Sequence, residues 1–255
     1  MNVKLIVSYD GTSYRGFQRQ TRWSNTIQNV LEECITKIFE KKINVCGSGR
    51  TDAGVHAIGQ VVNFSIDTKI PVIKIPELMN KRLPFDIRIV DAQQVRSAFN
   101  ARIDAKRREY RYLFYKGNCE FPGIDRFCWK LDNLFDLKIA AELCSNLMGT
   151  KDFNAFMSSG SSAATTVKTI YNCSIQKVNE FNWIFSKGNF QLYELTVEAN
   201  AFLYNMVRII VANIVRVATG QEDKHNFLEI LESKNRKLAG KMAPANGLYL
   251  TKVTY

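Results

Sequence analysis

A glycine-rich segment between two apolar runs is the feature that most restricts how this sequence can fold. Three glycines surround Arg50-Thr51-Asp52 within residues 47–54, and glycine permits positive φ angles and a close approach of ligands to the backbone. Residues 43–46 and 60–65, on either side, are rich in apolar side chains and are predicted to form strands. We therefore expect a loop that presents the Asp52 carboxylate between two rigid elements.

The glycine spacing is not that of a nucleotide-cofactor site. A dinucleotide-binding fingerprint needs a third glycine three residues after Gly49, where this sequence has Asp52, and the Gly-Lys-Ser/Thr of a P-loop is absent. A simpler interpretation is that Asp52 caps the turn that follows it, as aspartate commonly does. The spacing alone leaves both a catalytic and a capping role open.

Strands and amphipathic helices alternate in the first part of the chain. Glu32 is expected outside or at the edge of the buried face of the first helix. The order of elements is typical of a sheet that helices cover on one face. Besides the two strands beside the loop, the predicted elements are strands at 3–8 and 87–90 and helices at 27–39 and 73–82.

The second part of the chain repeats this mixture. Periodicity weakens between Asp91 and Arg107, which predicts a boundary between an N-terminal domain, 1–104, and a C-terminal domain, 105–255. The Ser-, Gly- and Ala-rich segment 158–166 is predicted to be a mobile loop. The predicted elements of this part are strands at 110–115, 170–176, 183–186 and 191–199 and helices at 137–148 and 202–215.

The charge of the chain favours a polyanionic partner. Among 255 residues there are 35 Lys and Arg against 24 Asp and Glu, a formal net charge of +11, and nucleic acid is the commonest partner of such proteins. No apolar run is as long as a membrane span, and the N-terminal residues lack the pattern of a cleavable signal segment. We expect a soluble, cytoplasmic protein that does not contact a membrane.

The cysteines and histidines do not form the pattern of a metal site. The chain has two histidines and six cysteines without a Cys-x-x-Cys pair, so a zinc site is not expected. Scattered cysteines in a protein without a secretion signal are usually reduced residues of the core. They are Cys34, Cys46, Cys119, Cys128, Cys144 and Cys173.

Two segments combine basic and aromatic side chains, as surfaces for single-stranded or looped RNA do. In residues 13–20, Tyr14 and Phe17 alternate with arginines, although both aromatics could equally pack beneath a loop. In residues 102–115, several cations precede a strand that would place Tyr110, with other aromatics, on one face. The alternative for this second segment is a half-buried aromatic strand with a solvated basic edge.

The sequence resembles the TruA family of tRNA pseudouridine synthases. Gly49-Arg50-Thr51-Asp52-Ala53-Gly54-Val55-His56-Ala57 is similar to the active-site signature of that family. Lys151 stands where relatives commonly have histidine, and Met242 where threonine is common. Further similar segments are Tyr9–Thr12 with Gly16–Gln20, Arg108-x-Tyr110-x-Tyr112, Phe202–Arg208 and Ala239–Leu250, so the resemblance covers nearly the whole chain.

The resemblance implies an α+β fold. It would consist of two related α/β (ferredoxin/RRM-like) domains with their sheets side by side, helices on the outer face and a basic catalytic cleft between the domains. It also implies a homodimer in which one tRNA contacts both subunits, a reaction that needs no cofactor or metal, and substrate uridines at adjacent positions of the anticodon stem-loop.

The resemblance also assigns roles to particular residues. Asp52 would be the catalytic nucleophile or base, Tyr110 would stack on the flipped uridine, and Arg208 would contact Asp52. Burial raises a carboxyl pKa by up to about 3 to 5 units, whereas a nearby opposite charge lowers it by about 1 to 3, so Arg208 would keep Asp52 ionised. The expected substrate-binding residues are Tyr110, Arg50, Thr51, Gly54, Val55, His56, Gln18, Arg108 and Leu248.

Other functions are compatible with parts of the pattern. A non-catalytic RNA-binding protein would use the same basic and aromatic segments, but a carboxylate in the glycine loop would oppose phosphate binding. A metal-dependent nuclease would need clustered carboxylates, and Asp52 has no acidic neighbour in sequence. The same chemistry on a different RNA also remains open, and Arg208 could be a surface residue at a helix boundary.

Overall fold

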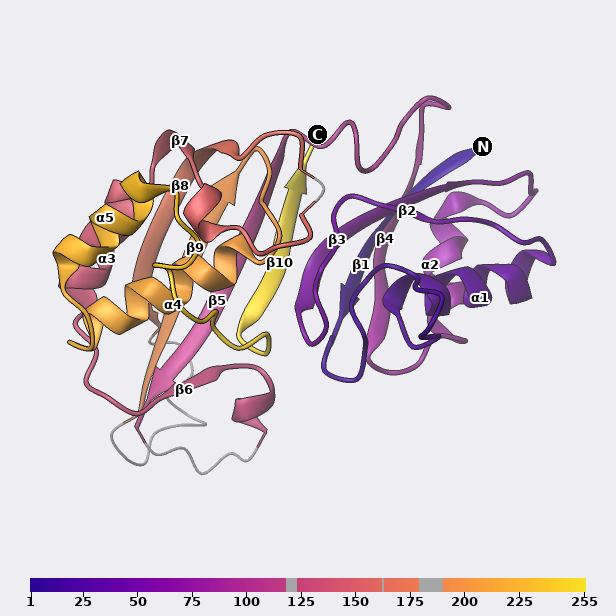
Figure 1. Cartoon of the computed structure of the whole chain (residues 1–255). Coiled ribbons are helices and arrows are strands. Elements are labelled where there is room, and N and C mark those ends of the chain that lie inside the picture. Colours follow the sequence, from indigo (N-terminus) through magenta and orange to yellow (C-terminus); the bar gives the residue numbers. More distant parts are fainter. Residues whose placement is uncertain (118–122, 162, 179–189) are drawn as a thin grey trace. The chain divides into compact units, whose positions relative to one another are not determined.

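A computed structural model of the chain describes residues 1–117, 123–161, 163–178 and 190–255 (Figure 1). The contacts divide the chain into two compact units: unit 1 is Met1–Lys106 with Tyr249–Tyr255, and unit 2 is Arg107–Leu248. The predicted boundary falls between residues 104 and 105, and the last seven residues, predicted in the second domain, pack with unit 1. The predicted strand 183–186 and Cys119 lie outside the described residues.

Unit 1 is a sheet with helices α1 and α2 beside one another on one side of it (Figure 1). Strand β1 pairs antiparallel with β3 and β4, β2 pairs antiparallel with β3, and β10 runs parallel to β3. The elements are β1 (Asn2–Tyr9), α1 (Ile27–Phe39), β2 (Cys46–Gly47), β3 (His56–Ser65), η1 (Val72–Lys74), α2 (Ile75–Asn80), β4 (Ile87–Val95) and β10 (Leu248–Thr254).

The core of unit 1 is formed by the alternate apolar residues of its strands and the apolar face of its helices. Alternate residues of β1 from Val3 to Tyr9 are buried, and the register places Leu5 opposite Val62 of β3. The apolar stripe of α1 is buried as well, and the side chain of Thr26 caps the start of this helix by accepting a hydrogen bond from the backbone N of Asn29. Because each large apolar side chain contributes about 1.5–3 kcal/mol when fully buried, these stripes hold the helices on the sheet.

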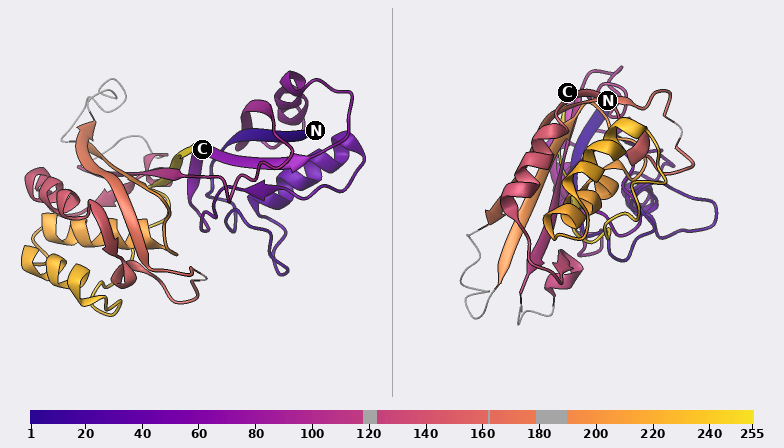
Figure 2. Two further views of the ribbon diagram at one scale, coloured as in Figure 1. Left: turned by 90° about the horizontal axis from the view of Figure 1, so that it is seen from above. Right: turned by 60° about the vertical axis from the view of Figure 1, so that its left-hand side comes forward.

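Unit 2 is also a sheet with packed helices, and Figure 2 shows it from two further directions. Strand β5 pairs antiparallel with β9, β9 with β8, and β8 with β7, while β6 runs parallel to β5. Helices α3, α4 and α5 pack against one another. The elements are β5 (Arg107–Lys116), η2 (Ile124–Arg126), β6 (Trp129–Leu131), α3 (Leu137–Asn146), β7 (Gly149–Asp152), η3 (Asn154–Phe156), β8 (Val167–Val178), β9 (Gln191–Ala199), α4 (Met206–Ala218) and α5 (Lys224–Ser233).

The α+β class is confirmed, but several local predictions need correction. The strand expected at 43–46 is reduced to β2, because the backbone N of Val45 donates to the Glu32 carboxylate at 3.0 Å instead of joining a strand ladder. Glu32 is therefore buried rather than outside or at the edge of the buried face. Helix α4 starts at Met206, four residues later than expected, after Asn205 in the left-handed conformation with φ of 60°.

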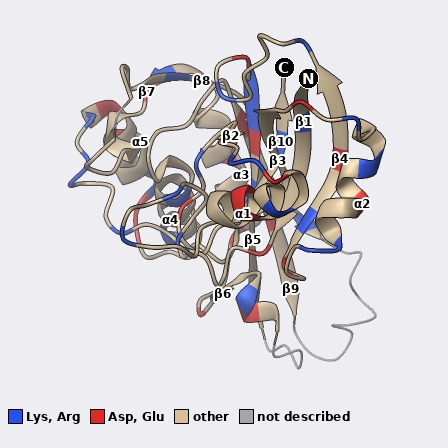
Figure 3. Ribbon diagram, turned by 90° about the vertical axis from the view of Figure 1, so that its right-hand side faces the viewer, with Lys and Arg blue, Asp and Glu red and all other residues tan. Residues whose placement is uncertain are grey.

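The charged residues lie on both units, and lysine and arginine occur on loops as well as on helices and strands (Figure 3). Within the described part of the chain, no helix is long and apolar enough to cross a membrane. The same residues contain no group of three or more His, Cys, Asp and Glu side chains that could hold a metal ion. All the cysteines that the structure describes are free thiols, and Cys46 is only partly buried.

Candidate active site

The Asp52 loop of unit 1 is held in place mainly through its backbone. The backbone N of Phe17 donates to the carbonyl O of Thr51 at 3.0 Å, and the N of Gly54 donates to the carbonyl O of Tyr14 at 3.4 Å. A further bond from Val55 N to Asp52 O, at 3.1 Å, closes the turn. These bonds hold the backbone on both sides of Asp52.

Glycines allow the two segments to pack this closely. A Cβ atom at Gly16, where φ is +91°, would stand 2.7 Å from the carbonyl O of Thr51, and one at Gly11 would stand 2.0 Å from the carbonyl O of Val55. Both distances are shorter than any ordinary contact of a side chain. Gly11 and Gly16, in the similar segments Tyr9–Thr12 and Gly16–Gln20, are therefore required by the Asp52 loop, which explains why these segments and the loop signature occur together.

A buried polar network lies beneath the loop. The hydroxyl groups of Tyr9 and Thr51 are 2.8 Å apart, and burial raises the pKa of Tyr9 to about 12. Gln60 Nε2 donates to the carbonyl O of Gly49 at 3.0 Å, while Gln60 Oε1 accepts from the Ser48 hydroxyl at 2.7 Å. Because buried polar groups are costly without partners, this network favours one conformation of the loop.

The residues of the loop differ in exposure. Arg50 is exposed, Asp52 is half-buried and Thr51 is buried. Arg50 forms no salt bridge with any residue that the structure describes, so its guanidinium is available to an external anion. Gln18, another predicted substrate-binding residue, is also exposed.

The residues that follow Asp52 are progressively more buried. Gly54 adopts a φ of +78°, and Val55 is buried. His56 is also buried: its Nδ1 lies 3.1 Å from the backbone N of Gly11, and its ring stacks on Tyr249 at a centroid distance of 4.8 Å. Direct contact of these residues with a substrate stays a prediction, but their packing shapes the loop that carries Asp52.

In unit 2, the predicted aromatic face of β5 is observed. Tyr110 is 8% exposed and meets Phe202 edge to face, with centroids 5.1 Å apart. Tyr112 and Phe114 are fully buried on the same face, as the strand period predicted. Arg108 is half-buried and donates through Nη1 to the carbonyl O of Asn200 at 3.0 Å.

Arg208 is anchored by its guanidinium at the start of α4. Its Nε donates to the carbonyl O of Ala243 at 2.9 Å, and its Nη1 lies 3.3 Å from Asn205 Oδ1. Both acceptors are neutral, and Arg208 is half-buried. These bonds fix the orientation of the guanidinium, whereas its pairing with Asp52 stays a prediction.

The segment Ala239–Leu250, called the closing segment below, connects Arg208 with the Tyr110 strand. The backbone N of Ala243 donates to the carbonyl O of Arg208 at 3.0 Å, the Tyr112 hydroxyl donates to the carbonyl O of Pro244 at 2.7 Å, and the N of Leu113 donates to the carbonyl O of Gly247 at 2.8 Å. Leu248, the last residue of unit 2, is 5% exposed. No sequence pattern predicts this connecting role, because any residue can supply a main-chain acceptor.

The basic-aromatic segment 13–20 divides into buried aromatics and exposed arginines. Tyr14 and Phe17 are buried, so the alternative that they pack beneath a loop describes them correctly. Tyr14 donates its hydroxyl proton to the Asp86 carboxylate at 2.7 Å. The exposed aromatic of this region is Trp23, which sequence reasoning missed, although a tryptophan directly after Arg22 in a polar segment is a usable signal.

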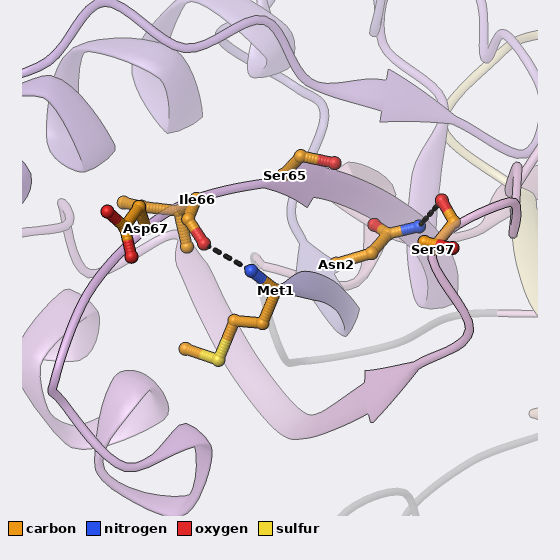
Figure 4. Close-up of a pocket in the computed structure, with 6 residues that line it drawn as sticks. All are labelled: Met1, Asn2, Ser65, Ile66, Asp67 and Ser97. Atoms are coloured by element: carbon orange, nitrogen blue, oxygen red, sulfur yellow. Dashed lines mark hydrogen bonds between the residues drawn. The ribbon is translucent and has the colours of Figure 1, made fainter.

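A hollow of about 360 Å³ lies away from these residues (Figure 4). It is at the Ser65 end of β3, about 30 Å from the Asp52 end for a strand of this length. Met1 donates from its amino group to the carbonyl O of Ile66 there, at 2.6 Å. None of the predicted site residues lines this hollow.

Comparison with known proteins identifies close relatives. A family model described as tRNA pseudouridine synthase matches residues 5–104 and 143–255. The tRNA pseudouridine synthase A of Thermoanaerobacter sp. (strain X514) is 41% identical over 254 residues, covering 100% of this chain and 99% of the relative. The protein of the same name from Acetivibrio thermocellus is 40% identical over 256 residues, with the same coverage.

Among solved structures, the similarity is weak. The archaeal box H/ACA sRNP Nop10-Cbf5 complex has a chain that is 13% identical, with a TM-score of 0.34. The match covers 85% of this chain and 43% of that chain. A TM-score this low carries no argument about function, so the full-length relatives are the informative comparison.

Proposed function

This chain belongs to the tRNA pseudouridine synthase family, and on that premise we propose that it isomerises uridine to pseudouridine in the anticodon stem-loop of tRNA, with Asp52 as the catalytic carboxylate. The observation that carries the proposal is the Asp52 loop: the signature segment is fixed by backbone hydrogen bonds, with Arg50 exposed and Asp52 half-buried. A carboxylate held in this way suits a reaction that needs an accurately placed nucleophile or base.

The reaction needs no external reactant. The bond between N1 of uracil and C1′ of ribose breaks, the base rotates, and a bond from C5 to C1′ forms. C5 loses a proton and N1 gains one, so atoms and electrons balance without an oxidant or reductant. Asp52 acts either on the sugar carbon as a nucleophile or on a sugar proton as a base, and both routes require its ionised form.

The remaining roles are proposed from the family resemblance. The target uridine must leave the helical stack, which costs a few kcal/mol, roughly, and stacking on protein groups offsets this. Tyr110 provides the ring that stacks on the base, Arg50 binds phosphate beside the vacated position, and Arg208 lowers the pKa of Asp52 by its charge. The bonds from Arg208 to Ala243 and Asn205 support this last role, because they hold the guanidinium in one orientation.

The family resemblance supports a cytoplasmic homodimer in which one tRNA contacts both subunits. Light scattering coupled to size-exclusion chromatography measures the mass directly. A mass near 58 kDa, twice the 29.2 kDa of the chain, is expected, and a mass near that of one chain at micromolar concentration would contradict the dimer.

The function is tested by mapping modified uridines. Purified protein is incubated with an unmodified tRNA transcript, and pseudouridines are located by carbodiimide labelling and primer extension. We expect new labelled positions in the anticodon stem-loop, and none in a transcript in which cytidine replaces those uridines. Binding without labelling would indicate a non-catalytic RNA-binding protein, and labelling only elsewhere in the transcript would overturn the proposed target.

A further inference from the structure

Unit 1 carries an exposed aromatic ring that contacts a guanidinium, on a segment next to residues that are hydrogen-bonded to the Asp52 loop. Arg15 Cζ lies 4.8 Å from the centroid of the Trp23 ring, and Trp23 is 47% exposed. Tryptophan is usually well buried, and an exposed one with a polar surround is typical of binding surfaces. All residues from 18 to 25 are exposed as well, so the ring stands on a polar surface rather than at the edge of the core.

The segment that carries Trp23 is held in a defined conformation. The backbone N of Arg15 donates to the carbonyl O of Asn25 at 3.0 Å, and Asn25 Nδ2 donates back to the carbonyl O of Ser13 at 3.1 Å. The carbonyl O of Ser24, next to Trp23, accepts from Asn29 Nδ2 of helix α1 at 3.0 Å. These bonds hold both ends of the segment. Binding of a ligand to the ring therefore costs little conformational entropy of the segment.

The same backbone supports the Asp52 loop. Tyr14 and Phe17, which flank Arg15 in sequence, make the hydrogen bonds to Gly54 and Thr51 described above. The Arg15–Trp23 pair and Asp52 therefore belong to one hydrogen-bonded part of unit 1. A group that stacked on Trp23 would be positioned relative to the Asp52 carboxylate without help from any other part of the chain.

The charge around the pair favours an anion. Arg15 and Arg22 form no salt bridge with any residue in the described part of the chain, whereas Arg19 is neutralised by Glu32 at 2.8 Å. One unneutralised guanidinium group, that of Arg15, thus lies over the exposed indole ring, and a second belongs to Arg22, the residue before Trp23. Nucleic acid is the ligand that offers phosphate and a flat ring together.

A second pair of this kind in unit 2 lacks that charge. Arg107 Cζ lies 4.2 Å from the centroid of the Tyr171 ring, and Tyr171 is 43% exposed. Arg107, however, is paired with Glu198 at 3.4 Å, and the same face of the sheet carries Glu109 and Glu194, which flank Arg111. The carboxylates disfavour phosphate there, so an exposed aromatic ring with a guanidinium is not sufficient by itself.

We propose that Trp23, backed by Arg15, stacks on an unpaired nucleobase of the RNA other than the target uridine, while Arg22 contacts a neighbouring phosphate. This inference rests on the proposed function for the identity of the ligand as RNA. Trp23 helps to bind and position the RNA, whereas Asp52 acts on the reacting nucleotide. Loss of the ring therefore weakens binding and leaves the chemical step of bound RNA unchanged.

The test compares Trp23→Ala with Tyr171→Ala, since each removes an exposed ring that contacts a guanidinium. The dissociation constant for an unmodified tRNA transcript and the single-turnover rate at saturating transcript are measured for both. Trp23→Ala is expected to raise the dissociation constant about tenfold with the saturated rate within about twofold of wild type. Tyr171→Ala is expected to change neither quantity, and circular dichroism checks that both variants are folded.

Two further variants sharpen the assignment. Trp23→Phe keeps a ring and is expected to recover most of the affinity, while the fluorescence quenching that RNA causes in the wild type is reduced because the reporting indole is absent. Arg22→Gln is expected to lower the slope of log binding constant against log salt concentration by about 0.7 to 0.9, the value for one phosphate contact. The Trp23 variants are expected to leave that slope unchanged.

The inference is overturned if Trp23→Ala binds the transcript as wild type does, or if its saturated rate falls while its affinity is retained. An equal loss of affinity in Tyr171→Ala would also overturn it, because the neutralised pair would then bind RNA as well. Failure of the proposed function is a separate result: wild type would bind the transcript and form no pseudouridine, while the effect of Trp23→Ala on binding would still be measurable.

Discussion

Asp52 in unit 1 and Arg208 in unit 2 are held by opposite means. The backbone on both sides of Asp52 is hydrogen-bonded to a neighbouring turn, and glycine is needed where the two segments meet. Arg208 is instead held by its own side chain, through bonds from Nε and Nη1 to Ala243 and Asn205. Replacing the Asp52 side chain should therefore leave its surroundings in place, whereas replacing Arg208 should disturb the packing of α4 on the closing segment.

Gly16→Ala moves the Asp52 loop without changing any charged residue. The added Cβ would lie 2.7 Å from the carbonyl O of Thr51 and 3.2 Å from the carbonyl C of Asp52, so the loop must shift. Since a displacement near 1 Å at a reacting group costs about 10²-fold in rate, we expect single-turnover pseudouridine formation to fall about a hundredfold, with RNA binding largely retained.

Gly149→Ala is the matched control for this experiment. Gly149 has a nearly identical φ of +90°, but a Cβ there meets nothing within 4 Å. Both variants introduce the same backbone strain, and only one of them collides with the Asp52 loop. Equal losses of rate in the two variants would show that strain, rather than displacement of Asp52, is responsible.

Arg208→Gln removes the charge and a bond that holds the side chain. We expect the rate to fall by about tenfold or more, because removing a nearby opposite charge raises a carboxyl pKa by about 1 to 3 units. The free energy of unfolding should also fall by about 1–3 kcal/mol, since the carbonyl O of Ala243 loses a donor. The rate is measured under single-turnover conditions and the stability by urea unfolding.

Arg216→Gln, on the same helix, provides the contrast. Arg216 pairs with Glu222 on a partly exposed surface, where such pairs contribute about 0–1 kcal/mol. Its rate is expected to equal that of wild type. If both arginine variants lost rate equally, a general effect on α4 would replace the specific role of Arg208.

Tyr110→Phe separates the ring of this residue from its hydroxyl group. The ring packs against Phe202 and is kept, so the affinity for RNA and the stability should stay close to wild type. If the hydroxyl group also assists the reaction, the rate at saturating transcript falls about tenfold, below the usual range for a general acid or base. A fully active variant would reduce Tyr110 to a stacking platform.

Tyr9→Phe tests how much the side chains beneath the Asp52 loop contribute. The rate should change by about twofold or less, because the backbone bonds to Tyr14 and Phe17 remain and a single buried hydrogen bond contributes only about 1 kcal/mol. Among the substitutions in and beneath the Asp52 loop, this is the smallest expected effect on activity. A rate loss as large as that of Gly16→Ala would show that side chains, and not the backbone, hold the loop.

The same variant changes the dependence of stability on pH. Burial raises the pKa of Tyr9 from 10.0 to about 12 in the folded protein, so the unfolded chain loses this proton first as the pH rises. The contribution is complete below pH 10 and is lost as the pH passes through about 12. The free energy of unfolding should therefore fall less steeply between pH 10 and 12 in Tyr9→Phe than in wild type.

The fold was predictable mainly in segments whose apolar residues recur at one regular spacing. Helix α1 and strand β9 have the predicted bounds, Ile27–Phe39 and Gln191–Ala199, because a single face of each is apolar. Strand β10 was not predicted, because its first residues belong to the closing segment and its pairing partner in unit 1, β3, is far away in sequence. Val45 shows the same limit, since a side chain of α1 takes the hydrogen bond that a strand partner would otherwise make.

The sequence indicated candidate site residues, whereas their surroundings became visible only in the structure. The signature around Asp52 follows from nine consecutive residues, and the structure adds the glycine contacts that hold it. From the sequence alone, Tyr14 and Phe17 cannot be distinguished from exposed residues that stack on bases. The tertiary structure shows that both are buried. The hydrogen bonds of Ala243 and Gly247 use main-chain atoms, which no side-chain pattern reveals.

The central claim is that the Asp52 carboxylate, on a loop fixed by its backbone, performs the isomerisation. The most direct test is Asp52→Asn, which keeps the shape of the side chain and removes the ionised oxygen. We expect the single-turnover rate on an unmodified tRNA transcript to fall about 10⁴-fold or more, with the dissociation constant within about twofold of wild type. A variant that still forms pseudouridine within about tenfold of the wild-type rate would contradict the account.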